Sequence, residues 1–320
     1  MIEPRDDELP LPGERRILVL GAGGGSDVIA AEVVRRALLR RAPGRQVDLA
    51  GLLNPKFEHH YLADGDAAPE RAINRAAGVA RFRRASLDEP PRSYAQRVRD
   101  GRCKPMPDAR LAELVDGPIY QLSTRFGLDE LCEFAAGYEA VLACDVGGDI
   151  LYGGPADNMV RTPLMDAFSL ALLRRIHARG TTGYVLLLGP GTDGELSPER
   201  LAAAIDALGR RGAIRARGRL SARDVEALAD LQERCGEASG KTLRLIVAVR
   251  AALASGASLP AIAGRDMERF RLWVDQAYLL DGAGVWSHNP LAAGDSREQI
   301  AAIASDLGWF APDPPLPEPT

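Results

Sequence analysis

Three glycine-rich segments of the sequence carry acidic residues of the kind that can do chemistry. The first ends at Asp27, the second holds Asp145 and Asp149, and the third holds Asp193 and Glu195. Carboxylates act as general acids and bases, and they are the oxygen ligands that Mg²⁺ prefers. We therefore predict a site for a small polar ligand, with Asp145, Asp149 and Asp193 as its catalytic residues and with Asp149 and Asp193 as candidate metal ligands.

Each of these segments follows a short apolar run that is typical of a buried strand. The runs are Ile17–Leu20, Val141–Cys144 and Val185–Leu188, and Val47–Leu52 is a fourth strand reached through a helix at Val28–Arg40. This β-α-β order predicts parallel strands with a right-handed crossover. Parallel strands present their carboxyl ends at one edge of the sheet, where ligands bind, so we expect the three segments to meet there.

The pattern predicts an α/β protein with a Rossmann-like three-layer fold, a mostly parallel sheet and a helical insertion after the second strand. We expect an N-terminal extension over residues 1–14 and a single domain over 15–310. The weakly patterned stretch 56–106 forms the insertion, and 311–320 forms a disordered, proline-rich tail. Arg271–Leu280 is expected to contain the final strand.

Glycines and small polar residues in the three segments are expected to bind the ligand. They are Gly21, Gly23, Gly24, Gly25, Ser26 and Asp27 in the first segment, Gly147, Gly148, Asp157 and Asn158 in the second, and Gly191, Thr192 and Glu195 in the third. Glycine lets the backbone approach a ligand closely, and N–H groups before a helix attract anions. Asp157 and Asn158 are also typical of a simple turn, and Asp27 of a helix start.

Asp27 constrains the kind of anion that the first segment can take. Its carboxylate would repel a phosphate unless Mg²⁺ or an ammonium group of the ligand lay between them. The segment therefore predicts either a metal-bridged phosphate or a zwitterionic ligand such as an amino acid. Mg²⁺ is thus a candidate cofactor.

A nicotinamide dinucleotide fits the first segment poorly. The G-x-G-x-x-G fingerprint is met at Gly21 and Gly23, but Ser26 stands at the third glycine position. The acid expected at the end of the second strand is absent, since Leu52, Leu53 and Asn54 stand there. We therefore do not expect NAD(P) as the cofactor.

Composition narrows the partners and the compartment. A net charge of −4 and a pI near 5.7 argue against a nucleic-acid partner. No apolar run approaches the roughly 20 residues of a membrane span, and the charged start does not resemble a signal peptide. The four cysteines show no paired spacing and are expected to be thiols in the cytoplasm. A small-molecule ligand is the expected partner, and a homo-oligomer is compatible with these features.

The chain resembles a bacterial and archaeal family known as domain of unknown function 1152. The matching stretches are Ile17–Asp27, Cys144–Gly153, Thr162–Ala167, Leu188–Leu196 and Gly236–Gly240. The family usually has glycine where this chain has Ser26. The resemblance implies a Rossmann-like sheet and a shared site, and it carries no general activity.

We hypothesise an enzyme that acts on a small polar metabolite, phosphorylated and nucleotide-like or amino-acid-like. The chemistry would be carboxylate acid/base or Mg²⁺-assisted bond making or breaking, as in a transferase, lyase or hydrolase. One alternative is a non-catalytic sensor of a small ligand or an accessory protein, and another is an NAD(P)-dependent oxidoreductase.

Overall fold

The computed structural model describes residues 8–53 except 24, residues 79–82, and residues 107–155 except 116, 125 and 126. It also describes residues 157 and 160 and the stretches 163–259 and 267–307. The predicted catalytic residues Asp145, Asp149 and Asp193 all lie within these ranges.

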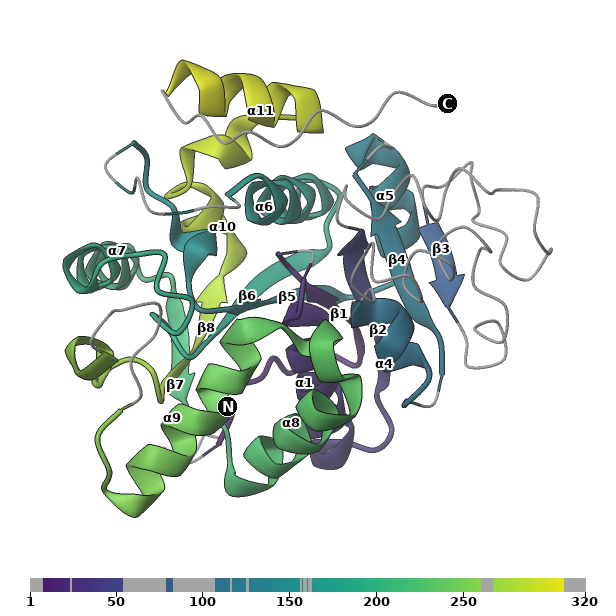
Figure 1. The fold of residues 1–320 in the computed structure, drawn as a ribbon. Coiled ribbons are helices and arrows are strands. Elements are labelled where there is room, and N and C mark those ends of the chain that lie inside the picture. Colours follow the sequence, from purple (N-terminus) through teal and green to yellow (C-terminus); the bar gives the residue numbers. More distant parts are fainter. Residues whose placement is uncertain are drawn as a thin grey trace, which may run out of the picture.

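An eight-stranded sheet crosses the centre of the described structure, in the order β3-β4-β2-β1-β5-β6-β8-β7 (Figure 1). The strands are β1 (Arg16–Gly21), β2 (Gln46–Leu53), β3 (Val79–Phe82), β4 (Ile119–Ser123), β5 (Ala140–Val146), β6 (Thr182–Leu188), β7 (Ile214–Gly218) and β8 (Ala277–Asp281). Neighbours from β4 through β6 pair in parallel, whereas β3 and β8 pair antiparallel. The four strands predicted from apolar runs are β1, β2, β5 and β6, and their parallel pairing is confirmed.

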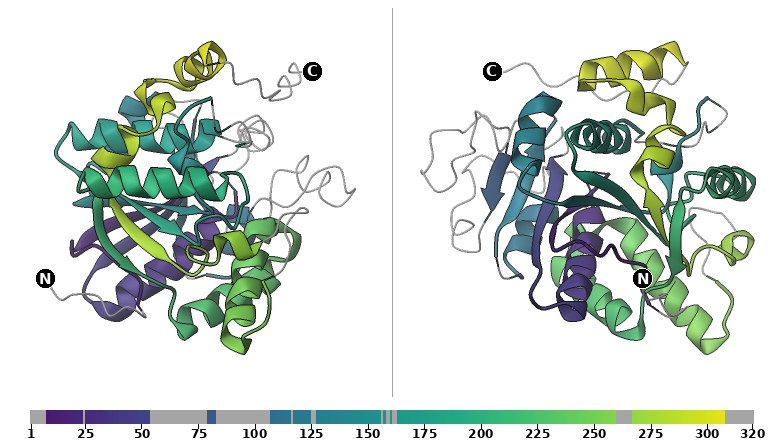
Figure 2. Two further views of the ribbon diagram at one scale, coloured as in Figure 1. Left: turned by 90° about the vertical axis from the view of Figure 1, so that its left-hand side faces the viewer. Right: turned by 180° about the vertical axis from the view of Figure 1, so that it is seen from behind.

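Helices cover both faces of the sheet (Figure 2). They are α1 (Asp27–Arg41), α4 (Pro107–Ala112), α5 (Leu128–Ala135), α6 (Pro163–His177), α7 (Pro198–Arg210), α8 (Ala222–Cys235), α9 (Gly240–Ser255), α10 (Gly282–Trp286) and α11 (Arg297–Asp306). Helices α1, α4, α8 and α9 lie on one face, and α5, α6, α7, α10 and α11 lie on the other. Each layer of helices packs against its face of the sheet and buries a separate cluster of apolar residues. The predicted α/β class and three-layer, Rossmann-like arrangement are therefore confirmed.

Burial on both faces explains the composition of the central strands. All seven residues of β5 are buried, and a strand with no solvated face must be apolar nearly throughout. Asp145 is the only charged residue of this strand. A charged side chain in such a position costs free energy unless something compensates it.

The two strands at the β7 end of the sheet differ from the sequence prediction. The predicted strand at Arg271–Leu280 begins only at Ala277, and residues 271–275 form turns that follow a 3-10 helix at Met267–Phe270. Phe270 and Val274 are buried, so these apolar residues pack into the core from turns, which periodicity does not distinguish from a strand. Strand β7 was not predicted, because it carries an arginine at every second position, as edge strands do.

The segments outside the central domain are described only in part. Of the predicted insertion, Val79–Phe82 is seen as β3, paired with β4, and the helical content predicted there lies outside the described residues, as does the tail at 311–320. In the N-terminal extension, Leu9 is buried and the N–H of Arg219 donates to the carbonyl of Glu8 at 3.1 Å. No helix of the described residues is long and apolar enough to cross a membrane.

Candidate functional site

The loops after β1, β5 and β6 lie side by side at the carboxyl edge, because these strands are neighbours in the sheet. The N–H of Ala22 donates to the carbonyl of Cys144 at 2.9 Å, which joins the first loop to β5. The N–H of Gly191 donates to the carbonyl of Gly147 at 2.5 Å, which joins the third loop to the second. The three segments therefore meet, as the strand prediction requires.

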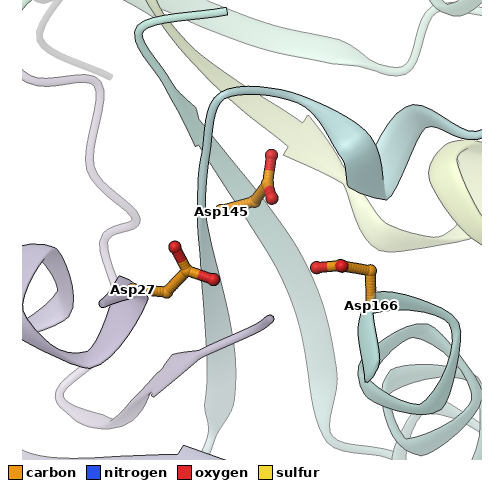
Figure 3. A group of neighbouring side chains, drawn as sticks. All are labelled: Asp27, Asp145 and Asp166. Atoms are coloured by element: carbon orange, nitrogen blue, oxygen red, sulfur yellow. The ribbon is translucent and has the colours of Figure 1, made fainter. Parts of the chain in front are cut away.

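Asp27, Asp145 and Asp166 form a three-carboxylate group at this edge (Figure 3). One oxygen of each lies within 4.8 Å of the corresponding oxygen of the other two. They come from the first turn of α1, the end of β5 and the first turn of α6, and their carboxyl groups converge on one space. Asp166 was not among the residues predicted from the sequence. The signal that could have indicated it is an acidic residue in the first turn of the helix that follows the second loop.

The first loop is shaped around Asp27. The N–H of Gly23 donates to Oδ2 of Asp27 at 2.7 Å. A Cβ atom on Gly23 would lie 2.5 Å from that oxygen and 3.4 Å from Oδ1 of Asp166, so a side chain at this position would displace the Asp27 carboxylate. Helix α6 is tied to the same loop, because Oγ of Ser169 donates to the carbonyl of Ala22 at 2.7 Å. Burial raises the pKa of Asp27 to about 7, against the lowering effect of the Gly23 hydrogen bond.

Asp145 and Asp166 are buried carboxyl groups without donors. Both are 0% exposed. Neither oxygen of either group accepts a hydrogen bond from an N–H or O–H among the described residues. Each lies within hydrogen-bonding range of the carboxyl group of Asp149, where ionised groups repel one another. Burial, followed by the charge of Asp149, raises both pKa values well above the usual range.

Asp149 and Asp193 extend the group along the loops. Burial raises the pKa of Asp149 to about 7, and the negative charges of Glu195 and Asp27 add to the shift. Burial and the charge of Asp149 raise the pKa of Asp193 well above its usual range. Oδ1 of Asp193 accepts from the N–H of Glu195 at 2.8 Å, whereas its Oδ2 has no donor among the described residues. The structure thus places the three predicted catalytic residues, Asp145, Asp149 and Asp193, close to one another.

Gly147 makes room for Asp193. Its φ is +115°, and a Cβ atom there would lie 2.5 Å from the Asp193 side chain. Gly148 follows with a φ of +119°. Two successive residues with positive φ turn the chain sharply after β5, and the turn carries Asp149 over the end of the sheet.

Two other buried acids of this protein, Glu32 and Asp224, have cationic partners. Glu32 is 0% exposed, and its carboxylate binds Nε of Arg35 at 2.6 Å and Nε of Arg36 at 2.7 Å. Asp224 is likewise paired with Arg40. Within the described part of the chain, by contrast, no ion pair involves Asp27, Asp145, Asp166 or Asp193. The fold therefore supplies counter-charges elsewhere and leaves these four carboxylates without one.

Several predicted ligand-binding residues have structural partners. Asp157 accepts from the N–H of Gly153 at 2.7 Å and binds Nε of Arg200 at 3.1 Å. The buried Thr192 donates from Oγ1 to the carbonyl of Gly189 at 2.7 Å. These contacts shape the second and third loops, and they do not join either side chain to the three-carboxylate group.

The rest of the first loop lies beside the start of α9. A Cβ atom on Gly240 would lie 2.9 Å from Oγ of Ser26, so two stretches that carry the family resemblance touch here. A Cβ atom on Gly25 would meet nothing within 4 Å among the described residues. A Cβ atom on Gly21 would clash with the backbone of Val28, and a Cβ atom on Gly191 would clash with the ring of Phe270. Gly24 and Asn158 lie outside the described residues.

A buried acid that does not belong to the three-carboxylate group, Asp108 of α4, lies against β2 at Gly51. Its Oδ1 occupies the place where a Cβ atom on Gly51 would stand. It is 2% exposed, this oxygen has no donor among the described residues, and burial raises its pKa to about 7. Gln121, the β4 partner of Gly51, is also buried with no partner for its amide among those residues. Sequence reasoning missed both residues, because neither follows β2 in the chain.

Strand order changes direction between β1 and β5, and the carboxylate group lies at that point. This is the place where open α/β sheets bind ligands. The fold and the group define the class as a Rossmann-like α/β protein with an acidic site at its switch point. The model of a family described as a protein of unknown function (DUF1152) matches residues 18–254, and the chain belongs to that family, as its resemblance indicated. No curated protein and no solved structure matches the chain.

Proposed function

We propose that this protein is a Mg²⁺-dependent enzyme that acts on a small phosphorylated metabolite at the carboxyl edge of the sheet. One observation carries the proposal: all four oxygens of Asp145 and Asp166 are buried without a donor among the described residues. Together with Asp27 they offer three oxygens close enough to hold one cation.

Charge favours a cation over the other ways of satisfying these groups. Ionised carboxylates without partners cost several kcal/mol each when buried. The same fold pairs Glu32 with two arginines, so its sequence can supply counter-charges where they are needed. A divalent cation provides the missing charge, and a set of carboxylate oxygens is the donor set of Mg²⁺, Ca²⁺ or Mn²⁺.

The choice of Mg²⁺ and a phosphate rests on the surroundings of the group. Mg²⁺ is commonly held by a few carboxylates together with substrate phosphates. The first loop leads into the N-terminus of α1 and touches the N-terminal end of α9 at Ser26, so the positive ends of two helices lie near it. Because Asp27 would repel a bare phosphate, the cation is the element that joins protein and ligand.

A cation held by Asp27, Asp145 and Asp166 would polarise a phosphoryl oxygen and would stabilise the charge that develops during bond breaking. Asp149 and Asp193 lie beside the group and provide either proton transfer or further metal ligands. The expected chemistry is therefore non-redox transfer, elimination or hydrolysis.

The test is a metabolite mixture incubated with purified protein and followed by mass spectrometry, with Mg²⁺ or with EDTA. We expect one phosphorylated compound to be consumed with Mg²⁺ only, and roughly 10²-fold or more slowly by Asp166→Asn. Asp206→Asn, an exposed change on α7, is the matched control and should behave like wild type.

Two results would overturn the proposal in different ways. A compound that binds tightly but is never consumed would favour the sensor hypothesis. Consumption that is equally fast in EDTA, or capture of an amino-acid-like ligand without any cation, would exclude the role of Mg²⁺.

A further inference from the structure

More carboxylate oxygens lie at this edge of the sheet than one cation in the three-carboxylate group would bind. A cation held by Asp27, Asp145 and Asp166 uses one oxygen from each. The second oxygens of Asp145 and Asp166 then remain, and these are also buried and without a donor among the described residues. Burying ionised oxygens without a partner costs free energy, and a second cation would reduce that cost.

Two more carboxylates lie next to the three-carboxylate group. Asp149 lies within hydrogen-bonding range of Asp145 and Asp166 but does not belong to the three-carboxylate group with Asp27. The N–H of Asp149 donates to Asp193, and Oδ2 of Asp193 is buried without a donor among the described residues. Asp149 and Asp193 are therefore the acidic side chains available to hold a further cation beside Asp145 and Asp166.

The balance of charge also favours a second cation. Carboxylates bind a metal ion only in their ionised form. With all five groups ionised, one divalent cation would leave a net charge of −3 on the cluster, and two would leave −1. The negative charge of Glu195 acts on Asp149 and Asp193 as well, which increases the deficit.

We propose that the cluster is a binuclear metal centre, in which Asp145 and Asp166 bridge two divalent cations, Asp27 holds the first and Asp149 and Asp193 hold the second. This inference rests on the proposed function and makes its substrate class narrower. Paired cations about 3.5–4 Å apart bind a phosphoryl group between them and stabilise both the attacking and the leaving oxygen. The substrate would accordingly be a phosphate ester or anhydride whose phosphoryl group contacts both cations.

Mn²⁺ is the probe for the test, because its binding is counted by calorimetry and its pairing is seen by electron paramagnetic resonance. We expect wild type to bind two Mn²⁺ per chain and to give an exchange-coupled spectrum. Asp193→Asn should bind one Mn²⁺ and give an uncoupled spectrum. Asp206→Asn should match wild type, and circular dichroism should show that each variant is folded.

The outcomes separate this inference from the proposed function. A single, uncoupled Mn²⁺ in both wild type and Asp193→Asn would refute the binuclear centre and leave the first site standing. No Mn²⁺ binding by wild type would refute both. Because the spectrum of wild type decides the question alone, a variant that fails to fold does not prevent the test.

Discussion

Asp108→Asn is expected to stabilise the protein at neutral and alkaline pH. Asp108 is buried under Gly51, its Oδ1 has no donor among the described residues, and its pKa lies near 7 instead of the usual 3.8. The folded state thus holds this proton more tightly than the unfolded state does. The stability that the protonated group contributes is complete below about pH 3.8 and is lost as the pH rises to about 7.

The size of the effect follows from the shift. Each pKa unit corresponds to about 1.4 kcal/mol, so the full shift of about 3 units is worth on the order of 4 kcal/mol. About 3 kcal/mol of this is lost between pH 5 and pH 8. Asparagine has no proton to lose, so the free energy of unfolding of Asp108→Asn relative to wild type should rise by about that amount over this interval.

Urea unfolding of both proteins at pH 5 and pH 8, with EDTA to remove divalent cations, measures the difference. The other buried carboxyl groups titrate in both proteins, so their contributions largely cancel. The exposed substitution Asp206→Asn is the control, and its free energy of unfolding should change between pH 5 and pH 8 by the same amount as that of wild type. A difference between Asp108→Asn and wild type that is the same at pH 5 and pH 8 would refute the reasoning, because the burial of Asp108 would then not penalise its charge.

Two further predictions concern the loops that carry the carboxylates. Gly147→Ala places a side chain at a residue with positive φ and against Asp193, so we expect a lower melting temperature and roughly tenfold or more weaker Mn²⁺ binding. Gly180→Ala is the control, because Gly180 also has a positive φ but a Cβ atom there would meet nothing within 4 Å among the described residues. This variant should lower only the melting temperature. Asn289→Leu removes the hydrogen bond from its amide to the carbonyl of Ile150 in the turn that carries Asp149, and should cost about 1–3 kcal/mol in urea unfolding. It should also weaken Mn²⁺ binding, and unchanged calorimetric affinity would show that this hydrogen bond does not position Asp149.

The central strands and part of the site could be predicted from the sequence. A strand buried on both faces is a continuous apolar run, and a glycine-rich exit marks its carboxyl end. Asp145 follows such a run directly and Asp149 follows the two glycines after the strand, so strand order alone places them at the edge of the sheet. Their neighbours across the edge follow from the parallel pairing of β1, β5 and β6.

Asp166 and Asp108 could not be found in this way. Each stands in the first turn of a helix, where an acidic residue interacts favourably with the helix dipole whether or not it has another role. Only the packing of α6 and α4 against the sheet brings Asp166 to Asp145 and Asp108 to Gly51. The distinction depends on contacts between segments far apart in the chain, which residue spacing does not encode.

The fit of Asp193 against Gly147 has an evolutionary consequence. The two residues belong to different loops, yet the side chain of one fills the volume that a side chain of the other would need. Mutations at the two positions are therefore not independently tolerated. Among the relatives of this chain, position 147 should remain glycine wherever position 193 is aspartate, whereas loss of Asp193 would remove the clash and leave only the positive φ to favour glycine there.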